Sequence, residues 1–382
     1  MTHKKKRLVL SVLLPAALAV LAVAYADDSN EDKLGPYKKL TTISISDLVG
    51  FDISWVDSGS GRYYLADRGT ATTPPTPRID VIDTERNKLV DQIPLSTAGN
   101  GVVAIRRTGD DNEDGPGTLV VGGADSTAIF IDLARPHAAP ETVSTGGKGR
   151  ADELAFDPKH HLILIANDRA VDLFVTFIAT TNPRKVVGQI KYDGSVPGNP
   201  TSTGGIEQPV WDGATGKFYI AIPATTDHPN GEVDEIDPVA MKITHRFPTS
   251  CGPAGLALIP DQHLMTSCGD VLDIKAGQQN EAKAVVFTVP NVGADEIWFN
   301  RGDERVYFGG YKGINVPVVN ALSPFNQIDN LVVGFIATPP APNHTTHSVA
   351  ADSENNRIFV PVSHEGVQVW TADQGDAEGQ DN

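Results

Sequence analysis

Two stretches of the chain, Ala151-Asp152-Glu153-Leu154-Ala155-Phe156-Asp157 and Ala294-Asp295-Glu296-Ile297-Trp298-Phe299-Asn300, share one outline. Each has two acids near its start, then an apolar run, and then Asp or Asn before a polar turn. A second strand-like run follows each turn, over 162–166 and 305–309. Two such runs around a polar turn are typical of an antiparallel β-hairpin.

The same outline recurs seven times, at intervals of roughly 40 to 55 residues. Its equivalent position falls at residues 52, 101, 152, 207, 254, 295 and 347. Further strands follow the hairpin in several copies, for example Ile79 to Asp83 and Lys88 to Ile93. Four strands in a repeat of this length are the signature of a propeller blade. The sequence therefore predicts an all-β, seven-bladed β-propeller with four-stranded antiparallel blades.

The two ends of the repeat region predict how the ring closes. Leu40 to Ser46 is an alternating strand outside any repeat, and the last repeat lacks a fourth strand after Gly366 to Thr371. Pairing of these N- and C-terminal strands completes one blade and removes a free sheet edge. The predicted propeller spans residues 37–371, after a linker over 27–36 and before an acidic, disordered tail over 372–382.

The composition supports this fold and narrows the range of partners. The 382 residues include 36 Gly and 27 Pro, which together disfavour a helical bundle. Hydrophobic residues make up 40% of the chain, enough for a core, so wholesale disorder is excluded. The formal net charge of −17 repels phosphates and anionic lipids. We therefore expect no nucleic-acid partner.

Residues 1–26 have the layout of a secretory signal peptide. Lys4 to Arg7 form a basic segment, Leu8 to Ala22 are mostly apolar, and Ala24-Tyr25-Ala26 ends in a small-x-small pattern. The alternative is an uncleaved membrane anchor, because the apolar stretch is close to the shortest length that spans a bilayer. We predict cleavage, a periplasmic or secreted mature protein, and no membrane attachment afterwards.

Cys251 and Cys268 are the two cysteines of the chain. If the segment between them folds as a hairpin about Ile259-Pro260-Asp261, the two thiols lie nearly opposite each other. In an exported protein this predicts a cross-strand disulfide. A free reactive pair and a metal–thiolate site are the alternatives.

Several motifs resemble the YVTN-repeat family of seven-bladed propellers, which are exported bacterial proteins. The matching stretches are Tyr64-Leu65-Ala66-Asp67, Ile79-Asp80-Val81-Ile82-Asp83-Thr84, Phe156-Asp157-Pro158 and Val349-Ala350-Ala351-Asp352. The resemblance covers about residues 37–371 and implies the propeller fold. These propellers resemble both enzymes and binding scaffolds, so function has to be argued from the site.

The inner strands of a propeller begin at one end of its central channel, so the residues at their starts converge there. The predicted metal ligands at this mouth are Asp52, Asp152, Glu207, Asp295 and His347. With 48 acids in 382 residues, composition alone would place about one acid among seven positions. Clustered carboxylates need a compensating cation, and we expect a divalent ion, which could be calcium, magnesium, manganese or zinc. The alternative is that these acids cap loops by binding backbone N–H groups.

We predict catalytic roles for Glu153 and Glu296, each one residue beyond a ligand position, and for His347. The arrangement resembles lactonase-type propellers, which hold a metal at the channel mouth. That resemblance implies a metal-assisted hydrolase, lactonase or lyase acting on a small molecule. The alternative is a non-catalytic periplasmic or secreted propeller that binds a small molecule or a partner protein. We expect a monomer in either case.

The second strand of each blade returns to the same end of the channel. Polar residues there predict an outer rim that recognises a substrate, consisting of Asp67, Arg68, Asn167, Asp168, His228 and His364. Arg68 would bind an anionic group. Each residue could instead belong to a solvated loop.

Two further patterns have structural interpretations. Asp110, Asn112 and Asp114, followed by Gly115, form a D-x-N-x-D-G pattern that predicts a structural calcium site, although an ordinary acidic hairpin loop is the alternative. The twelfth position of that pattern is Val121, where a calcium loop would have Glu. Separately, the recurring tryptophans of the inner strands are interpreted as packing residues between blades, and they are Trp55, Trp211 and Trp298.

Overall fold

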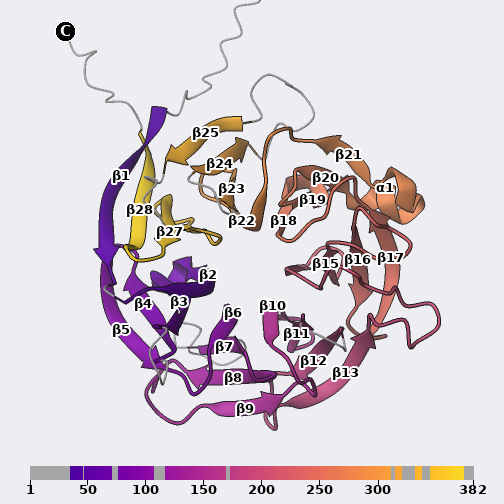
Figure 1. The fold of residues 1–382 in the computed structure, drawn as a ribbon, viewed down its shortest axis with the longest axis horizontal. Helices are drawn as coiled ribbons and strands as arrows, with labels where there is room; N and C mark the ends of the chain where they lie inside the picture. The colour runs from indigo at the N-terminus through magenta and orange to yellow at the C-terminus, as the bar shows by residue number, and fades with distance from the viewer. Residues whose placement is uncertain are drawn as a thin grey trace, which may run out of the picture. The chain divides into compact units, whose positions relative to one another are not determined.

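The repeated outline forms seven antiparallel sheets of four strands in the described part of the chain, arranged as blades around one axis (Figure 1). The computed structural model describes residues 35–45, 47–70, 76–106, 117–168, 173–310, 315–320, 332–337 and 345–373. All of these belong to one unit, Leu34–Asn382. The predicted signal peptide, calcium loop and most of the acidic tail lie outside the described residues.

The first three blades follow one another along the chain, and each blade is numbered by its place in the sequence. Their strands are β2 (Gly50–Asp57), β3 (Arg62–Gly69), β4 (Arg78–Asp83) and β5 (Lys88–Pro94) in blade 1; β6 (Gly99–Ile105), β7 (Thr118–Gly123), β8 (Thr127–Asp132) and β9 (Glu141–Ser144) in blade 2; β10 (Ala151–Asp157), β11 (Leu162–Asn167), β12 (Phe174–Ala179) and β13 (Lys185–Lys191) in blade 3.

Blades 4 to 6 repeat this order, and blade 5 carries a short helix. Their strands are β14 (Pro209–Asp212), β15 (Lys217–Ile222), β16 (Glu232–Asp237) and β17 (Lys242–Pro248) in blade 4; β18 (Leu256–Ile259), β19 (His263–Thr266), β20 (Asp270–Asp273) and β21 (Val285–Thr288) in blade 5; β22 (Ala294–Asn300), β23 (Arg305–Gly310), β24 (Asn315–Asn320) and β25 (Val332–Ala337) in blade 6. The helical segments described are η1 (Ser58–Ser60), η2 (Pro260–Gln262), α1 (Ile274–Gln279) and η3 (Glu281–Lys283).

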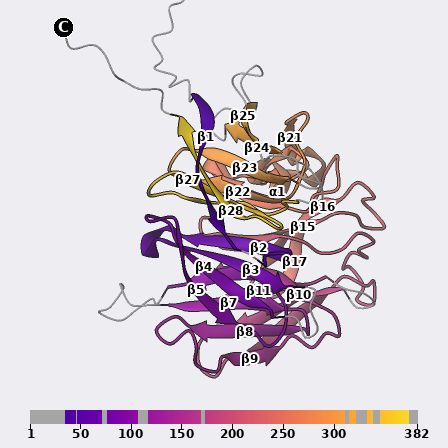
Figure 2. The ribbon, with the colours of Figure 1, turned by 60° about the vertical axis from the view of Figure 1, so that its left-hand side comes forward.

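Blade 7 is built from both ends of the propeller, as predicted. It combines β26 (Ala350–Asp352), β27 (Arg357–Val362) and β28 (Gly366–Asp373) with β1 (Gly35–Ser44). The indigo strand β1 runs antiparallel beside the yellow β28, and Thr42 pairs with Gln368 (Figures 1 and 2). This pairing gives β28 a partner on each side, which removes an open edge.

The hydrophobic core is divided among the interfaces between blades. Seven apolar clusters are present in the described residues, each shared by two successive blades; Val103 and Leu154 join blades 2 and 3, and Phe51 and Ala350 join blades 1 and 7. Each inner strand contacts the inner strand of the next blade around the ring, including β26 against β2. The apolar side chains therefore pack between blades, and the axis itself is left to other residues.

Asp and Asn side chains cap the hairpin turns at the far end of the inner strands. Asp157 accepts a hydrogen bond from the backbone N–H of Lys159 at 2.8 Å, and Asp212 accepts one from Ala214 at 2.9 Å. Asn300 and Asp352 do the same in blades 6 and 7. These local bonds form the polar turns that the repeated outline predicts.

A β-bulge interrupts the start of four inner strands. In β10, Ala151 pairs with Asn167 and Leu154 pairs with Ile165, so three steps on one strand oppose two on the other. The same shift occurs in β2, β6 and β22. Simple alternation would send Asp152 and Glu153 to opposite faces of the sheet, whereas a bulge re-aims side chains. Here it lets both acids face the axis.

The strand pairs on either side of the bulge in β6 show that the predicted alignment of blade 2 was wrong by one residue. In β6 the flanking pairs are Gly99 with Gly123 and Val102 with Val121. Asn100, and not Gly101, is therefore equivalent to Asp152. Gly101 packs so closely on blade 3 that a Cβ atom there would lie 2.4 Å from the carbonyl oxygen of Asp152. The missing side chain is what allows this approach.

Within the described residues, no helix is both long and apolar enough to cross a membrane.

The cysteine prediction is confirmed, because Cys251 and Cys268 form a disulfide with their Cα atoms 6.0 Å apart. The two residues lie just outside β18 and β19, so the bond closes the open end of that hairpin.

Candidate functional site

The starts of the inner strands and the loops beside them form a charged cluster that we call the acidic mouth. Its members are Asp52, Asn100, Asp152, Asp168, Glu207, Asp295, His347, Arg68 and Arg150. They come from six blades, since each blade except blade 5 contributes at least one of them. The convergence that the sequence predicted is therefore present, but arginines take part in it.

Arg150, in the loop before β10, joins three carboxylates. Its Nη2 atom lies 2.5 Å from Oδ2 of Asp152 and 2.7 Å from Oδ2 of Asp168. Its Nη1 atom lies 3.7 Å from Oδ2 of Asp52, which belongs to blade 1. One guanidinium thus links two blades and compensates buried negative charge.

Asp52 is the other centre of the mouth. It forms an ion pair with Arg68, and its Oδ1 atom lies 3.4 Å from Nε2 of His347. The His347 ring stacks on Phe51 with 4.8 Å between centroids. Arg68 also donates to Oδ1 of Asn100 at 2.9 Å. These contacts connect blades 7, 1 and 2 around the mouth.

The carboxyl groups of the mouth differ in their affinity for protons. Burial acts to raise the pKa of Asp52, but His347, Arg68 and Arg150 outweigh it and hold that pKa below its usual value. Burial, followed by the charges of Asp168 and other acids, raises the pKa of Glu207 to about 8. The mouth therefore carries less negative charge at neutral pH than its residue types suggest.

The five predicted metal ligands do not form one group. Asp152 and Glu207 lie with Asp168, which was predicted for the rim: each of the three offers a carboxylate oxygen, and these atoms lie within 4.8 Å of one another. Asp52 and His347 instead pair with each other, and Asp52 also pairs with Arg68. Asp295 is outside the three-oxygen group and is affected by the charges of His347 and Asp52. Carboxylate oxygens suit a hard divalent cation. However, Arg150 already contacts two of these three carboxylates, so an ion would compete with a fixed positive charge.

Four of the six predicted rim residues lie away from the axis. Asp67 is fully buried and pairs with Nη2 of Arg78 at 2.6 Å, and buried Asn167 accepts a hydrogen bond from Thr145 at 2.5 Å. His228 pairs with Glu232 in blade 4. His364 is exposed beside blade 7, where its backbone N–H donates to Leu48.

Arg68 and Asp168 lie at the mouth, where Arg68 pairs with Asp52 and Asp168 pairs with Arg150. Each directly follows a misplaced residue, Asp67 or Asn167, at the end of a second strand. Successive side chains of a strand point to opposite faces. The sequence prediction treated both members of each pair alike, whereas only the second faces the axis.

Glu153 and Glu296 occupy a second level along the axis. Both are buried, and Oε2 of Glu296 accepts a hydrogen bond from Ser348 Oγ at 2.5 Å. Oε2 of Glu153 has no hydrogen-bond partner among the described residues. Both acids line the cavity described next, whereas His347 lies in the mouth. The three predicted catalytic residues are thus divided between two places.

A cavity of about 380 Å³ lies along the axis beyond these two glutamates, and we call it the aromatic cavity. Its walls include Trp55, Trp211 and Trp298. These side chains are half-buried and touch the apolar clusters between blades, as predicted, but they also face the cavity. The Trp55 and Trp298 rings meet edge to face with 5.1 Å between centroids, although their blades are not adjacent.

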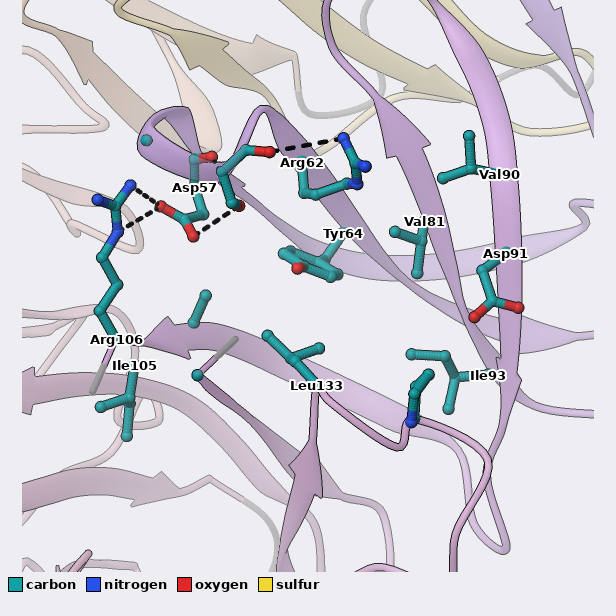
Figure 3. A pocket seen from close by; sticks show the side chains of 15 residues that line it. Asp57, Arg62, Tyr64, Val81, Val90, Asp91, Ile93, Ile105, Arg106 and Leu133 are labelled. Atoms are coloured by element: carbon teal, nitrogen blue, oxygen red, sulfur yellow. Dashed lines mark hydrogen bonds and ion pairs between the residues drawn. The ribbon is translucent and has the colours of Figure 1, made fainter. Parts of the chain in front are cut away.

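A separate cavity of about 510 Å³ lies between blades 1 and 2 (Figure 3). Tyr64 projects into it, and at one end Arg106 forms an ion pair with Asp57 at 2.5 Å. Asp91 pairs with Nε2 of His137 at 3.0 Å. The acids of this cavity therefore have partners, in contrast to Glu153.

Sequence reasoning missed Arg150 and Asn100. Arg150 stands two residues before Asp152, so its proximity to that acid was visible in the sequence. Its contact with Asp52, about a hundred residues away, was not. Asn100 was missed because the outline of blade 2 was aligned one residue too far along the chain, as the pairs Gly99–Gly123 and Val102–Val121 show.

Comparison with known structures supports the fold. The chain is similar to one in the crystal structure of a mitotic checkpoint complex, with a TM-score of 0.59 and 14% identity over 96% of this chain and 98% of that chain. It is also similar to the Cps50 (Swd1) β-propeller domain of Myceliophteria thermophila, with a TM-score of 0.62 and 12% identity over 88% and 99%. At these identities the likeness concerns the fold alone. No protein-family model and no curated protein matches the sequence.

Proposed function

We propose that this chain is an exported, non-catalytic binding propeller that holds a cationic group of a partner protein at its acidic mouth. The observation that carries this proposal is the set of carboxylates that surrounds Arg150 in the mouth. A guanidinium lies among carboxylates from two blades, at 2.5 and 2.7 Å from its nearest partners. The mouth therefore already binds one cationic side chain, which belongs to the same chain.

Two half-buried acids leave room for a second cation. Glu207 and Asp295 form no ion pair with another described residue, yet both lie within the field of the other mouth acids. Burial and the acid charges raise the pKa of both groups. A cation from a partner would reverse that effect by favouring the ionised form.

Export and the finer family likeness also belong to this proposal. The first 26 residues have the signal-peptide pattern, and the disulfide between Cys251 and Cys268 suits an oxidising compartment. The motifs that resemble YVTN repeats agree with an exported propeller. One of the similar chains comes from the crystal structure of a mitotic checkpoint complex, which supports a protein as the partner.

A metal-assisted hydrolase of lactonase type is the second candidate. It is favoured by the three oxygens of Asp152, Asp168 and Glu207, which lie close enough to share one ion. Elemental analysis of purified protein separates the two candidates. The binding proposal expects no stoichiometric divalent metal and no change of the melting curve with a chelator. One equivalent of metal that is lost in Asp168→Asn, together with lactone hydrolysis, would establish the hydrolase.

The binding proposal is tested by calorimetric titration at low salt with a tetralysine peptide and, as its opposite, a tetraglutamate peptide. We expect tetralysine to bind and the Glu207→Gln/Asp295→Asn double variant to weaken its binding at least tenfold. The matched control is Glu85→Gln/Glu354→Gln, which removes two exposed acids from hairpin turns at the other end of the blades. Equal losses in both double variants, or no preference for tetralysine, would contradict the proposal.

A further inference from the structure

We propose that the aromatic cavity binds a small organic cation with an apolar body, of the alkylated or aryl ammonium type. The cavity lies at the opposite end of the axis from the acidic mouth, and this proposal does not depend on the function proposed for the mouth. Its volume of about 380 Å³ falls within the usual range of small-molecule sites, roughly 300–1,000 Å³.

The walls of the cavity are aromatic. Inner strands of six blades contribute lining residues, and the large ones are Trp55, Phe156, Trp211, Trp298 and Phe299. All five are half-buried, so each keeps part of its ring surface free of packing. The faces of indole and phenyl rings attract cations, most strongly when the site is shielded from water.

The floor of the cavity is acidic. Glu153 is 7% exposed and Glu296 is 1% exposed. Oε2 of Glu153 has no hydrogen-bond partner in the described part of the chain, although it lines the cavity. The third charged lining residue is Arg301, which is exposed in a hairpin turn. A buried carboxyl group with one oxygen left without a hydrogen bond, beneath aromatic walls, is complementary to a desolvated ammonium group.

The surroundings of Glu153 explain why a cation would be favoured there. Four further acids act on Glu153 through their charges: Glu207, Glu296, Asp152 and Asp295. Their negative charge adds to the attraction that the aromatic walls exert on an ammonium group.

The test uses phenyltrimethylammonium and its neutral isostere tert-butylbenzene, below the solubility limit of the latter. Binding is followed by calorimetry and by intrinsic fluorescence, because Trp55, Trp211 and Trp298 line the cavity. We expect the cation to bind at least tenfold more tightly than the isostere. Glu153→Gln should weaken cation binding at least tenfold.

Two further variants keep the test decisive. Trp211→Leu should also weaken cation binding, and if it does not fold, Trp211→Phe replaces it. Glu354→Gln removes an exposed acid from a hairpin turn and should leave the affinity within twofold. Unchanged affinity in Glu153→Gln, equal binding of the isostere, or no binding of the cation at millimolar concentrations would each overturn the proposal.

Discussion

Both ends of the propeller axis contain buried acids, but the negative charge of these acids is compensated differently at the two ends. At the acidic mouth, Arg150 contacts Asp152 and Asp168, and Asp52 is shared with Arg68 and His347. At the aromatic cavity, Glu153 is also buried, but its Oε2 atom has no hydrogen-bond partner among the residues that the structure describes. Asp152 and Glu153 are adjacent in sequence, so the difference comes from what the fold brings to each.

This contrast has a physical consequence for each end. A buried ion pair is stable only while both partners are present, because the remaining charge would be left uncompensated. A buried acid without a partner avoids the cost of its charge by binding a proton, which a cationic ligand can replace. The mouth is therefore expected to be sensitive to the loss of its own arginine, and the cavity to a ligand from outside.

The largest effect is expected when the internal cation of the mouth is removed by Arg150→Met. This leaves Asp152 and Asp168 without their partner, and we expect a loss of about 3–5 kcal/mol in the free energy of unfolding at pH 7. The loss should shrink in acid, because a protonated carboxyl group needs no compensating cation. Urea unfolding measures both values.

The control for this change is Arg135→Met, since Arg135 forms an exposed pair with Asp132. Removal of an exposed pair should change stability by less than about 1 kcal/mol. Similar losses in the two variants would mean that Arg150 has no special role in compensating buried charge.

A second comparison uses the pH dependence of the mouth. A free glutamate titrates near pH 4.5, whereas Glu207 in the fold has a pKa of about 8. Between these values the folded chain keeps a proton that the unfolded chain has released. The free energy of unfolding should therefore decrease as pH rises through this window, by at most about 1.4 kcal/mol per pH unit.

Glu207→Gln removes this titration and should flatten the dependence of stability on pH between about 5 and 8. Denaturant unfolding at several pH values gives the slope. A slope identical to that of the unmodified chain would show that Glu207 is ionised in the folded state.

The smallest effect is expected where the two ends meet, at Gly101. A Cβ atom there would come within 2.4 Å of the Asp152 carbonyl oxygen, so Gly101→Ala must shift the bulge that presents Asp152 and Glu153. We expect a loss of about 1–3 kcal/mol and a changed affinity for phenyltrimethylammonium. Gly213→Ala is the control, because its Cβ would have nothing nearer than 3.8 Å. Equal melting temperatures for the two variants would argue against tight packing at the bulge.

Much of the architecture could be predicted because its causes are local. The paired apolar runs, the capping residues Asp157 and Asp212, and the spare strand at each end were visible in the sequence. They led to the four-stranded blades and to the pairing of β1 with β28. The signal peptide and the calcium loop remain predictions.

The site was predicted less well, for reasons that lie in register and convergence. Equivalent positions were assigned by aligning the repeated outlines, and blade 2 has no acid at its strand start to fix the alignment, so Asn100 was missed by one residue. Asp67 was placed on the rim although it is buried beside Arg78. No periodic pattern indicates which of two neighbouring polar residues at the end of a strand will face the axis.

By itself, the sequence determined the seven repeats, their strands and turns, the closing strand pair and the concentration of acids at the starts of inner strands. These features depend on residues close together in the chain, where alternation and turn chemistry act. The tertiary structure alone decided which acids are compensated. Arg150 reaches Asp52 only when blades 1 and 3 stand around a common axis, and Glu153 has no ion pair within the described ranges. Charge compensation acts through space, so it depends on the closed ring.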